Sequence, residues 1–262
     1  MHTEEKFHEK GLAGVNLEEA VDQIRNTPIY ILGISGSSRK GTTDYLTELA
    51  LEEAAKIPGV ETEFIPLHRY RNALHQCIQC EACLKLESGH PLDHLCAPFE
   101  DAMEELIPKF IDADGYIIAS PVYEMTYTPL LGSFMGRLRP LFRAYNGIHK
   151  NKVGGSIAVG GTRHGGEENT CQMINNFFLL NGMFSVSGDN GGYTGACVWS
   201  RDKLPNELDD PIGIAKVRDL GRRVGEMTRI VKYGRILTGE PIIDSRHLEL
   251  FQGGRYDPNH IV

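Results

Sequence analysis

From Ile29 onward, the chain alternates short apolar runs with longer segments of helical period. The first run, Ile29 to Ile34, is almost continuously apolar, which is typical of a strand covered on both faces. The same pattern predicts further strands over 60–67, 115–120, 153–159 and 184–187, and helices over 44–56, 98–111, 129–145, 168–180 and 212–231. Strands separated by helices of this length pair in parallel through right-handed crossovers. We therefore predict an α/β fold with a doubly wound parallel sheet.

All of these predicted elements fall within residues 29–232, which we expect to form one domain. Residues 1–28 and 233–262 contain too few apolar residues to build cores of their own. We expect them to be extensions that wrap a neighbouring subunit, with simple tails as the alternative. Residues 69–97 interrupt the alternation with a cysteine-rich insertion after the second strand.

The charge balance excludes some classes of partner. Lys and Arg total 27 and Asp and Glu total 35, a formal net charge of −8, which argues against binding to nucleic acid. No uninterrupted apolar run approaches the roughly 20 residues of a membrane helix, and the first 28 residues do not resemble a signal peptide. We therefore expect a soluble, cytoplasmic protein that binds neither nucleic acid nor a membrane.

A loop rich in hydroxyl groups, 35–43, follows the first predicted strand and precedes a helix. Hydroxyls, backbone N–H groups and a guanidinium therefore meet where a helix N-terminus favours an anion. The spacing of Gly36 and Gly41 mimics a nucleoside-triphosphatase loop, but Thr42 stands in place of its lysine, and the dinucleotide fingerprint lacks its third glycine. A terminal phosphomonoester fits best, with simple helix capping as the alternative.

Two more loops follow predicted strands that should end at the same edge of the sheet. Residues 120–129 contain prolines and Tyr123, which suit the face of a planar ring, although a plain strand-to-helix turn would look the same. Residues 160–167 are rich in glycine, which lets the backbone approach a ligand, although a flexible loop is the alternative. Taken together, the three loops predict a site for a flat heterocycle with one phosphate. Flavin mononucleotide (FMN) is such a molecule.

Four of the six cysteines fall within 20 residues of one another, which favours metal binding or redox chemistry over a disulfide scaffold. Close spacing of three thiolates suits an iron–sulfur cubane, whereas a structural zinc site or metal-free thiols are the alternatives. The four residues are Cys77, Cys80, Cys83 and Cys96. We expect ordinary burial for the two others, Cys171 and Cys197.

The motifs together resemble the flavodoxin-like NAD(P)H-dependent FMN reductase family. The resemblance lies in residues 33–39, Thr42 and Thr43, residues 113–123 and the glycine loop 160–166. The cysteine motif resembles the iron–sulfur flavoprotein branch of that family. The resemblance implies a five-stranded parallel sheet in the order 2-1-3-4-5, FMN, a [4Fe–4S] cluster, NAD(P)H or another electron donor, and a homodimer or homotetramer.

The resemblance also implies roles for individual residues. The phosphate would be held by Ser35, Ser37, Arg39, Thr42 and Thr43. The isoalloxazine ring would be framed by Pro121, Val122, Tyr123, Glu124, Met125, Gly160, Gly161, Thr162 and Arg163. The cluster would be held by Cys77, Cys80, Cys83 and Cys96, with His94 as the alternative fourth ligand because 12 residues separate the last two cysteines.

These expectations describe an FMN-dependent oxidoreductase that relays electrons between FMN and the cluster, to a redox partner or a small-molecule acceptor. No catalytic acid or base is assigned, because the flavin supplies the chemistry. An FMN reductase or electron carrier without a cluster is the first alternative. A non-redox flavin-binding regulatory module is the second, since a fold does not fix an activity.

Overall fold

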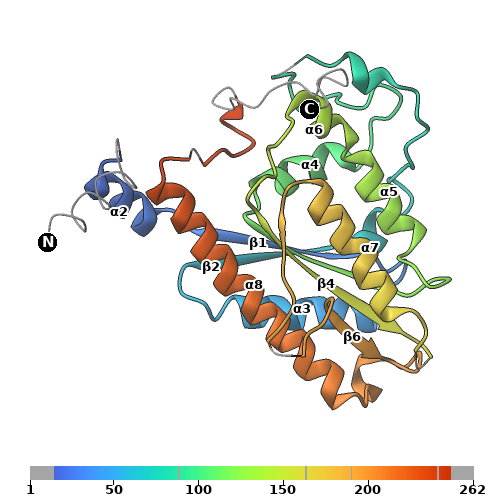
Figure 1. Ribbon diagram of the computed structural model, residues 1–262. Helices are drawn as coiled ribbons and strands as arrows, with labels where there is room; N and C mark the ends of the chain where they lie inside the picture. The colour runs from blue at the N-terminus through green and yellow to red at the C-terminus, as the bar shows by residue number, and fades with distance from the viewer. Residues whose placement is uncertain (1–14, 88, 163, 190, 241, 249–262) are drawn as a thin grey trace, which may run out of the picture.

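The computed structural model describes residues 15–87, 89–162, 164–189, 191–240 and 242–248. Its centre is a parallel sheet (Figure 1), and the strands follow the order β2-β1-β3-β4-β5. The strands are β1 (Ile29–Ser35), β2 (Val60–Pro66), β3 (Gly115–Pro121), β4 (Val153–Gly160) and β5 (Phe184–Ser185). The α/β class, the flavodoxin-like topology and the strand order are therefore confirmed.

A sixth strand, β6 (Ala196–Trp199), was not predicted from the sequence. Strand β5 pairs only with the first two residues of β4, whereas β6 pairs in parallel with its last four, 157–160. Two short strands thus share one edge position. The chain returns to β4 through Gly195, whose φ is +157°. A Cβ atom at this position would lie 2.5 Å from the carbonyl oxygen of Ser156. Only glycine fits there without displacing the backbone.

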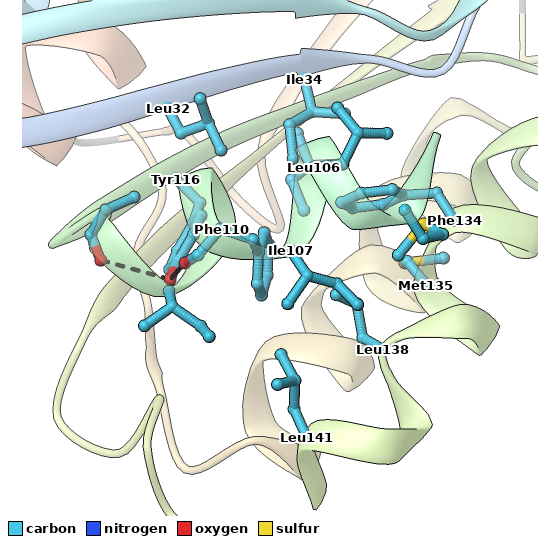
Figure 2. Packing of buried hydrophobic residues seen from close by; sticks show 14 of the residues in the cluster. Leu32, Ile34, Leu106, Ile107, Phe110, Tyr116, Phe134, Met135, Leu138 and Leu141 are labelled. Carbon is cyan, nitrogen blue, oxygen red and sulfur yellow. Dashed lines mark hydrogen bonds between the residues drawn. The ribbon is translucent and has the colours of Figure 1, made fainter. Parts of the chain in front are cut away.

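Helices cover both faces of the sheet, as expected for a doubly wound fold (Figure 1). Ile31 packs with α3 (Thr42–Ala54) and α8 (Pro211–Leu237) on one face. The next residue, Leu32, packs on the other face with α4 (Met103–Asp112), α5 (Pro129–Arg137), α6 (Arg139–Ala144) and α7 (Glu167–Leu180). Figure 2 shows this second core, in which Leu32, Ile34 and Tyr116 lie over α4.

Several helix boundaries differ from the prediction. The helix predicted over 129–145 is divided at Leu138, because Pro140 lies in the first turn of α6 and has no N–H to continue the ladder of α5. Helix α4 begins at Met103 instead of residue 98, and α8 continues to Leu237 instead of ending at 231. The described residues also form three short 3-10 helices, η1 (Leu67–Tyr70), η2 (Ala82–Lys85) and η3 (Pro205–Glu207).

The N-terminal extension contains a helix, α2 (Leu17–Asn26). Asn16 caps it by accepting a hydrogen bond at 3.1 Å from the backbone N–H of Glu18. This helix lies against α8 of the same chain. The predicted contact of the extensions with a neighbouring subunit remains a prediction, and residues 1–14 and 249–262 lie outside the described residues. No helix among the described residues is both long and apolar enough to cross a bilayer.

Candidate functional site

A pocket of about 200 Å³ lies at the carboxyl ends of β1, β3 and β4, and we call it the strand-end pocket. Open α/β sheets bind their ligands at this edge. All three loops predicted from the sequence contribute to its wall, together with a fourth loop, 200–204, that was not predicted. Its lining residues are Ser37, Arg39, Lys40, Gly41, Thr42, Thr43, Pro121, Val122, Tyr123, Val159, Gly161, Ser200, Asp202, Lys203 and Leu204.

The hydroxyl-rich loop presents the start of α3 to this pocket. The N-cap residue is Gly41, and within the described chain no side chain caps the helix. Its first N–H groups are therefore available to an anion, at the positive end of the helix dipole. Ser37 closes the loop by donating a hydrogen bond from its hydroxyl to the carbonyl oxygen of Arg39 at 2.6 Å. The geometry disfavours simple capping as the role of these hydroxyls.

Ser35 is not part of the pocket wall. It is fully buried, and its hydroxyl donates to Oδ1 of Asp44 at 2.5 Å. The other carboxylate oxygen of Asp44 lies 3.1 Å from Nε2 of His68, just after β2. Ser35 therefore shapes the loop from beneath and does not face a ligand in this pocket.

The loop after β3 contains a tight hairpin. Tyr123 and Thr126 exchange two backbone hydrogen bonds of 2.9 Å, and the two residues between them, Glu124 and Met125, have positive φ angles of 48° and 63°. Such angles are unfavourable for non-glycine residues and are often retained at functional sites. Tyr123 lines the strand-end pocket, whereas Glu124 does not, and Met125 lines a neighbouring pocket instead.

The glycine loop after β4 contributes only Gly161 to the strand-end pocket. The carboxylate of Asp202 lies 2.5 Å from the position of an added Cβ at Gly161, so a larger residue there would push this side chain aside. Gly160 and the exposed Thr162 do not line the pocket, and Arg163 lies outside the described residues. The neighbouring pocket, of about 570 Å³, is lined by Met125, His164, Glu167, Cys197 and Trp199, among others.

The unpredicted loop 200–204 follows β6. The N–H of Ser200 donates to the carbonyl oxygen of Gly160 at 2.8 Å, and Arg201 and Asp202 both have left-handed backbone angles. The loop therefore turns sharply over the pocket. In the sequence, only the short apolar run 196–199 followed by polar residues indicates this strand and the loop after it.

All four clustered cysteines line one small pocket, which we call the cysteine pocket. Its wall also includes Phe99, Arg137 and Arg139. Cys80 is flanked by two non-glycine residues with left-handed backbone, Gln79 (φ 53°) and Glu81 (φ 62°). Strain of this kind persists where the surrounding structure holds it in place.

His94, the alternative fourth ligand, does not line this pocket. Its Nδ1 instead lies 3.7 Å from Glu100 and 3.6 Å from Glu104. Among the residues that the structure describes, no three His, Cys, Asp or Glu side chains are gathered closely enough to bind a single metal ion.

A buried ion pair supports the cysteine pocket. Arg137, only 1% exposed, donates from Nη1 and Nη2 to the two carboxylate oxygens of Asp101 at 2.7 and 3.0 Å. Burial would raise the pKa of Asp101, but the hydrogen bonds from Arg137 and its neighbours lower that pKa to about 2. Burial raises the pKa of the Cys83 and Cys96 thiols, against the opposing effect of Arg139 and Arg137, respectively.

The two other cysteines lie elsewhere, and their side chains contact each other. Cys171 is fully buried in α7, as predicted, whereas Cys197 in β6 is partly exposed to the neighbouring pocket.

The cysteine segment, residues 69–97, is joined to the hydroxyl-rich loop, because Nη1 of Arg71 donates to the carbonyl oxygen of Ser38 at 3.3 Å.

Residues 29–191 match the family model of the NADPH-dependent FMN reductases. The chain belongs to this family. It is accordingly an FMN-dependent oxidoreductase, and its curated relatives place it in the iron–sulfur flavoprotein branch of the FMN reductases. An iron–sulfur flavoprotein of Methanocaldococcus jannaschii is 40% identical over 207 residues, which cover 77% of this chain and 98% of that protein. One of Methanosarcina thermophila is 34% identical and covers 78% of this chain and 98% of its own.

Solved structures share the fold of this FMN reductase at low sequence identity. A flavone reductase has a TM-score of 0.56 at 22% identity and covers 78% of this chain and 64% of its own. An NADH:FMN oxidoreductase has a TM-score of 0.52 at 20% identity and covers 77% and 89%, respectively. These likenesses support the flavodoxin-like fold alone.

Proposed function

We propose that this FMN reductase binds FMN in the strand-end pocket and a [4Fe–4S] cluster through Cys77, Cys80, Cys83 and Cys96, and relays electrons between them. The observation that carries the proposal is that four cysteines spread over 20 residues line a single pocket. Their segment is hydrogen-bonded to the loop at the start of α3. The curated relatives are named iron–sulfur flavoproteins.

The chemistry of the strand-end pocket suits a phosphorylated flavin. The uncapped start of α3, with Arg39, Lys40 and Thr42, offers N–H groups, positive charge and hydroxyls for a phosphate. Tyr123 with Pro121 and Val122 would contact the ring, and Gly161 would let the backbone approach it. We assign Ser37, Arg39, Thr42 and Thr43 to the phosphate, and Ser35 to positioning of their loop.

The other described residues that the resemblance assigned to the ring do not line the strand-end pocket, and we propose that they support the loops around it. Glu124 and Met125 would fix the hairpin that orients Tyr123, because their strained backbone forms its turn. Gly160 and Thr162 would set the path of the glycine loop beside Gly161. Asp202 and Lys203 would close the pocket from the opposite side.

Three cysteines, each separated from the next by two residues, favour a cubane over a single zinc ion. Ligands of one zinc ion all lie about 2.3 Å from it, so they must be tightly gathered. Each iron of a cubane takes one thiolate, so the four sulfurs are more widely spread. The guanidinium groups of Arg137 and Arg139 would offset the negative charge of four thiolates.

Bound FMN would supply both hydride and single-electron chemistry, and the protein would supply binding and orientation. NAD(P)H is the proposed electron donor, and a redox protein or a small molecule is the proposed acceptor. Tyr123 is 45% exposed at the mouth of the strand-end pocket and Cys77 and Cys80 are exposed. A second copy of the chain could cover these residues, so we propose a homodimer or homotetramer.

Anaerobic purification followed by assays of flavin, iron, sulfide and zinc tests the proposal. We expect one FMN per chain, with iron and sulfide in the ratio of a [4Fe–4S] cluster. FMN without iron or sulfide would favour a reductase or carrier that lacks a cluster. Stoichiometric zinc would assign the cysteines to a structural site, and a preparation that neither contains FMN nor takes it up would overturn the proposal.

A further inference from the structure

We propose that Arg137 donates a hydrogen bond from its Nε–H to a sulfur atom in the cysteine pocket, and thereby positions the cluster and raises its reduction potential. The inference rests on the proposed cluster. The acceptor would be either the Cys96 thiolate or an inorganic sulfide of the cluster, which share the same chemistry as hydrogen-bond acceptors.

The first argument is an unused donor. The Nη1 and Nη2 atoms of Arg137 are engaged with Asp101, and Nη1 also donates to the carbonyl oxygen of His75 at 3.0 Å. Its Nε is buried and has no partner at normal hydrogen-bond geometry among the described residues, while the guanidinium lies close enough to Cys96 to lower the pKa of that thiol. A guanidinium stays protonated at any accessible pH, so the buried Nε is always a hydrogen-bond donor. A buried donor needs an acceptor. Arg137 lines the cysteine pocket, which supplies a place for that acceptor.

The second argument is rigidity. The guanidinium carbon of Arg137 lies 4.9 Å from the centre of the Phe99 ring, and the same ring stacks on His75 at 4.6 Å with an interplanar angle of 2°. The bidentate pair with Asp101 also fixes the plane of the guanidinium. The direction of the Nε–H is therefore set before any cluster binds.

The third argument is the place of these contacts in the chain. His75 precedes the first cysteine of the motif by two residues, and Phe99 and Asp101 follow the last one, Cys96, by three and five residues. Arg137 thus ties both ends of the cysteine segment to α5. Hydrogen bonds and positive charge near the sulfurs stabilise the reduced, more negative form of a cluster, which raises its potential.

Spectroscopy of the wild-type holoprotein gives a test that needs no variant. Protein containing arginine labelled with ¹⁵N at Nε is reduced anaerobically, and its cluster is examined by pulsed electron paramagnetic resonance. We expect a ¹⁵N coupling to the reduced cluster. A fully loaded cluster without such a coupling would overturn the inference.

Two variants identify the arginine. Arg137→Lys keeps a positive charge but loses the planar fork, whereas Arg139→Lys makes the same change in the other arginine of the pocket wall. In Arg137→Lys, we expect the ¹⁵N coupling to be lost and the midpoint potential to become more negative. In Arg139→Lys, we expect the coupling and the wild-type midpoint potential to be retained. A coupling and potential unchanged in Arg137→Lys would assign this residue a purely structural role.

Each result separates this inference from the proposed function. Wild-type protein that holds no cluster contradicts the proposed function before the question of Arg137 arises. If Arg137→Lys fails to fold or to incorporate iron, the measurement on labelled wild type together with Arg139→Lys still decides the inference.

Discussion

The hydroxyl of Thr42, the first residue of α3, donates a hydrogen bond to the carbonyl oxygen of Lys203 at 2.6 Å. The two residues are 161 positions apart in the chain. This contact joins the loop predicted to hold the phosphate to the loop after β6, which was not predicted. The strand-end pocket is therefore closed by four loops, and β6 matters for the site as well as for the sheet.

Replacing Thr42 by Val should weaken FMN binding. The change keeps the shape of the side chain but removes a hydroxyl whose one proton is donated to the carbonyl oxygen of Lys203 and would turn to the phosphate when FMN binds. Loss of a hydrogen bond to a charged group corresponds to roughly tenfold or more in Kd. Fluorescence titration of the apoprotein with FMN measures the effect. Thr47→Val is the matched control, because Thr47 is buried further along α3 and its hydroxyl bonds, among the described residues, only the carbonyl oxygen of Thr43. Equal effects of the two changes would argue against the phosphate assignment.

Replacing Cys80 by Ser should leave FMN bound and abolish iron incorporation. Cys80 lines the cysteine pocket, and its oxygen analogue is a poor ligand for a cluster. Iron, sulfide and flavin assays of the anaerobically purified variant measure the result. Cys197→Ser serves as control, since Cys197 lies in β6 and should not affect iron content. Stoichiometric iron and sulfide in Cys80→Ser would contradict the cluster assignment.

Gly195→Ala and Gly234→Ala should change stability in opposite directions. An added Cβ at Gly195 would lie 2.5 Å from the Ser156 carbonyl oxygen, in a backbone conformation that favours glycine, so we expect a loss of about 1–3 kcal/mol. Gly234 lies within α8 and has nothing within 4 Å of an added Cβ, so alanine should add about 0.5–1 kcal/mol through helix propensity. Urea unfolding followed by circular dichroism measures both. A neutral Gly195→Ala would show that β6 tolerates displacement.

Lys152 should make stability depend on pH in the alkaline range. Burial lowers the pKa of Lys152 to about 7, although the carboxylate of Asp114 opposes this effect. In the unfolded chain the same group stays protonated up to about pH 10.4. The unfolded state therefore binds more protons between these values, and the contribution of Lys152 to the free energy of unfolding rises with pH by about 1.4 kcal/mol per unit.

Lys152→Met should flatten this rise between pH 7.5 and 9, and should stabilise the protein at pH 7.5. Urea unfolding at the two pH values measures the slope. Lys150→Met is the control, since Lys150 is exposed, and should leave the slope unchanged. A slope that is the same in Lys152→Met and wild type would show that Lys152 stays charged in the folded protein.

The elements that could be predicted from the sequence are those whose pattern is local. The continuous apolar run of β1 and the helical spacing of α3 are examples, and both lie where expected. The break between α5 and α6 was not predicted, although a proline at position 140 is a sequence signal for the interruption of a helix. Strand β6 was missed because a glycine-containing excursion separates it from β5, and four residues give little periodicity.

The site was predictable to the level of loops but not of side-chain directions. Ser35 and Ser37 are two residues apart with the same hydroxyl group, yet Ser35 turns inward to Asp44 while Ser37 lines the strand-end pocket. Asp101 and Arg137 form an ion pair although they are 36 positions apart, and no local sequence pattern predicts a contact at that separation. Tertiary packing decides these features.

Titration of the apoprotein with FMN and with riboflavin, followed by quenching of flavin fluorescence, tests the central claim most directly. We predict one FMN bound per chain, and an affinity for riboflavin at least about tenfold lower because riboflavin lacks the phosphate. Absence of FMN binding, or equal affinities for the two flavins, would contradict a phosphate site at the start of α3.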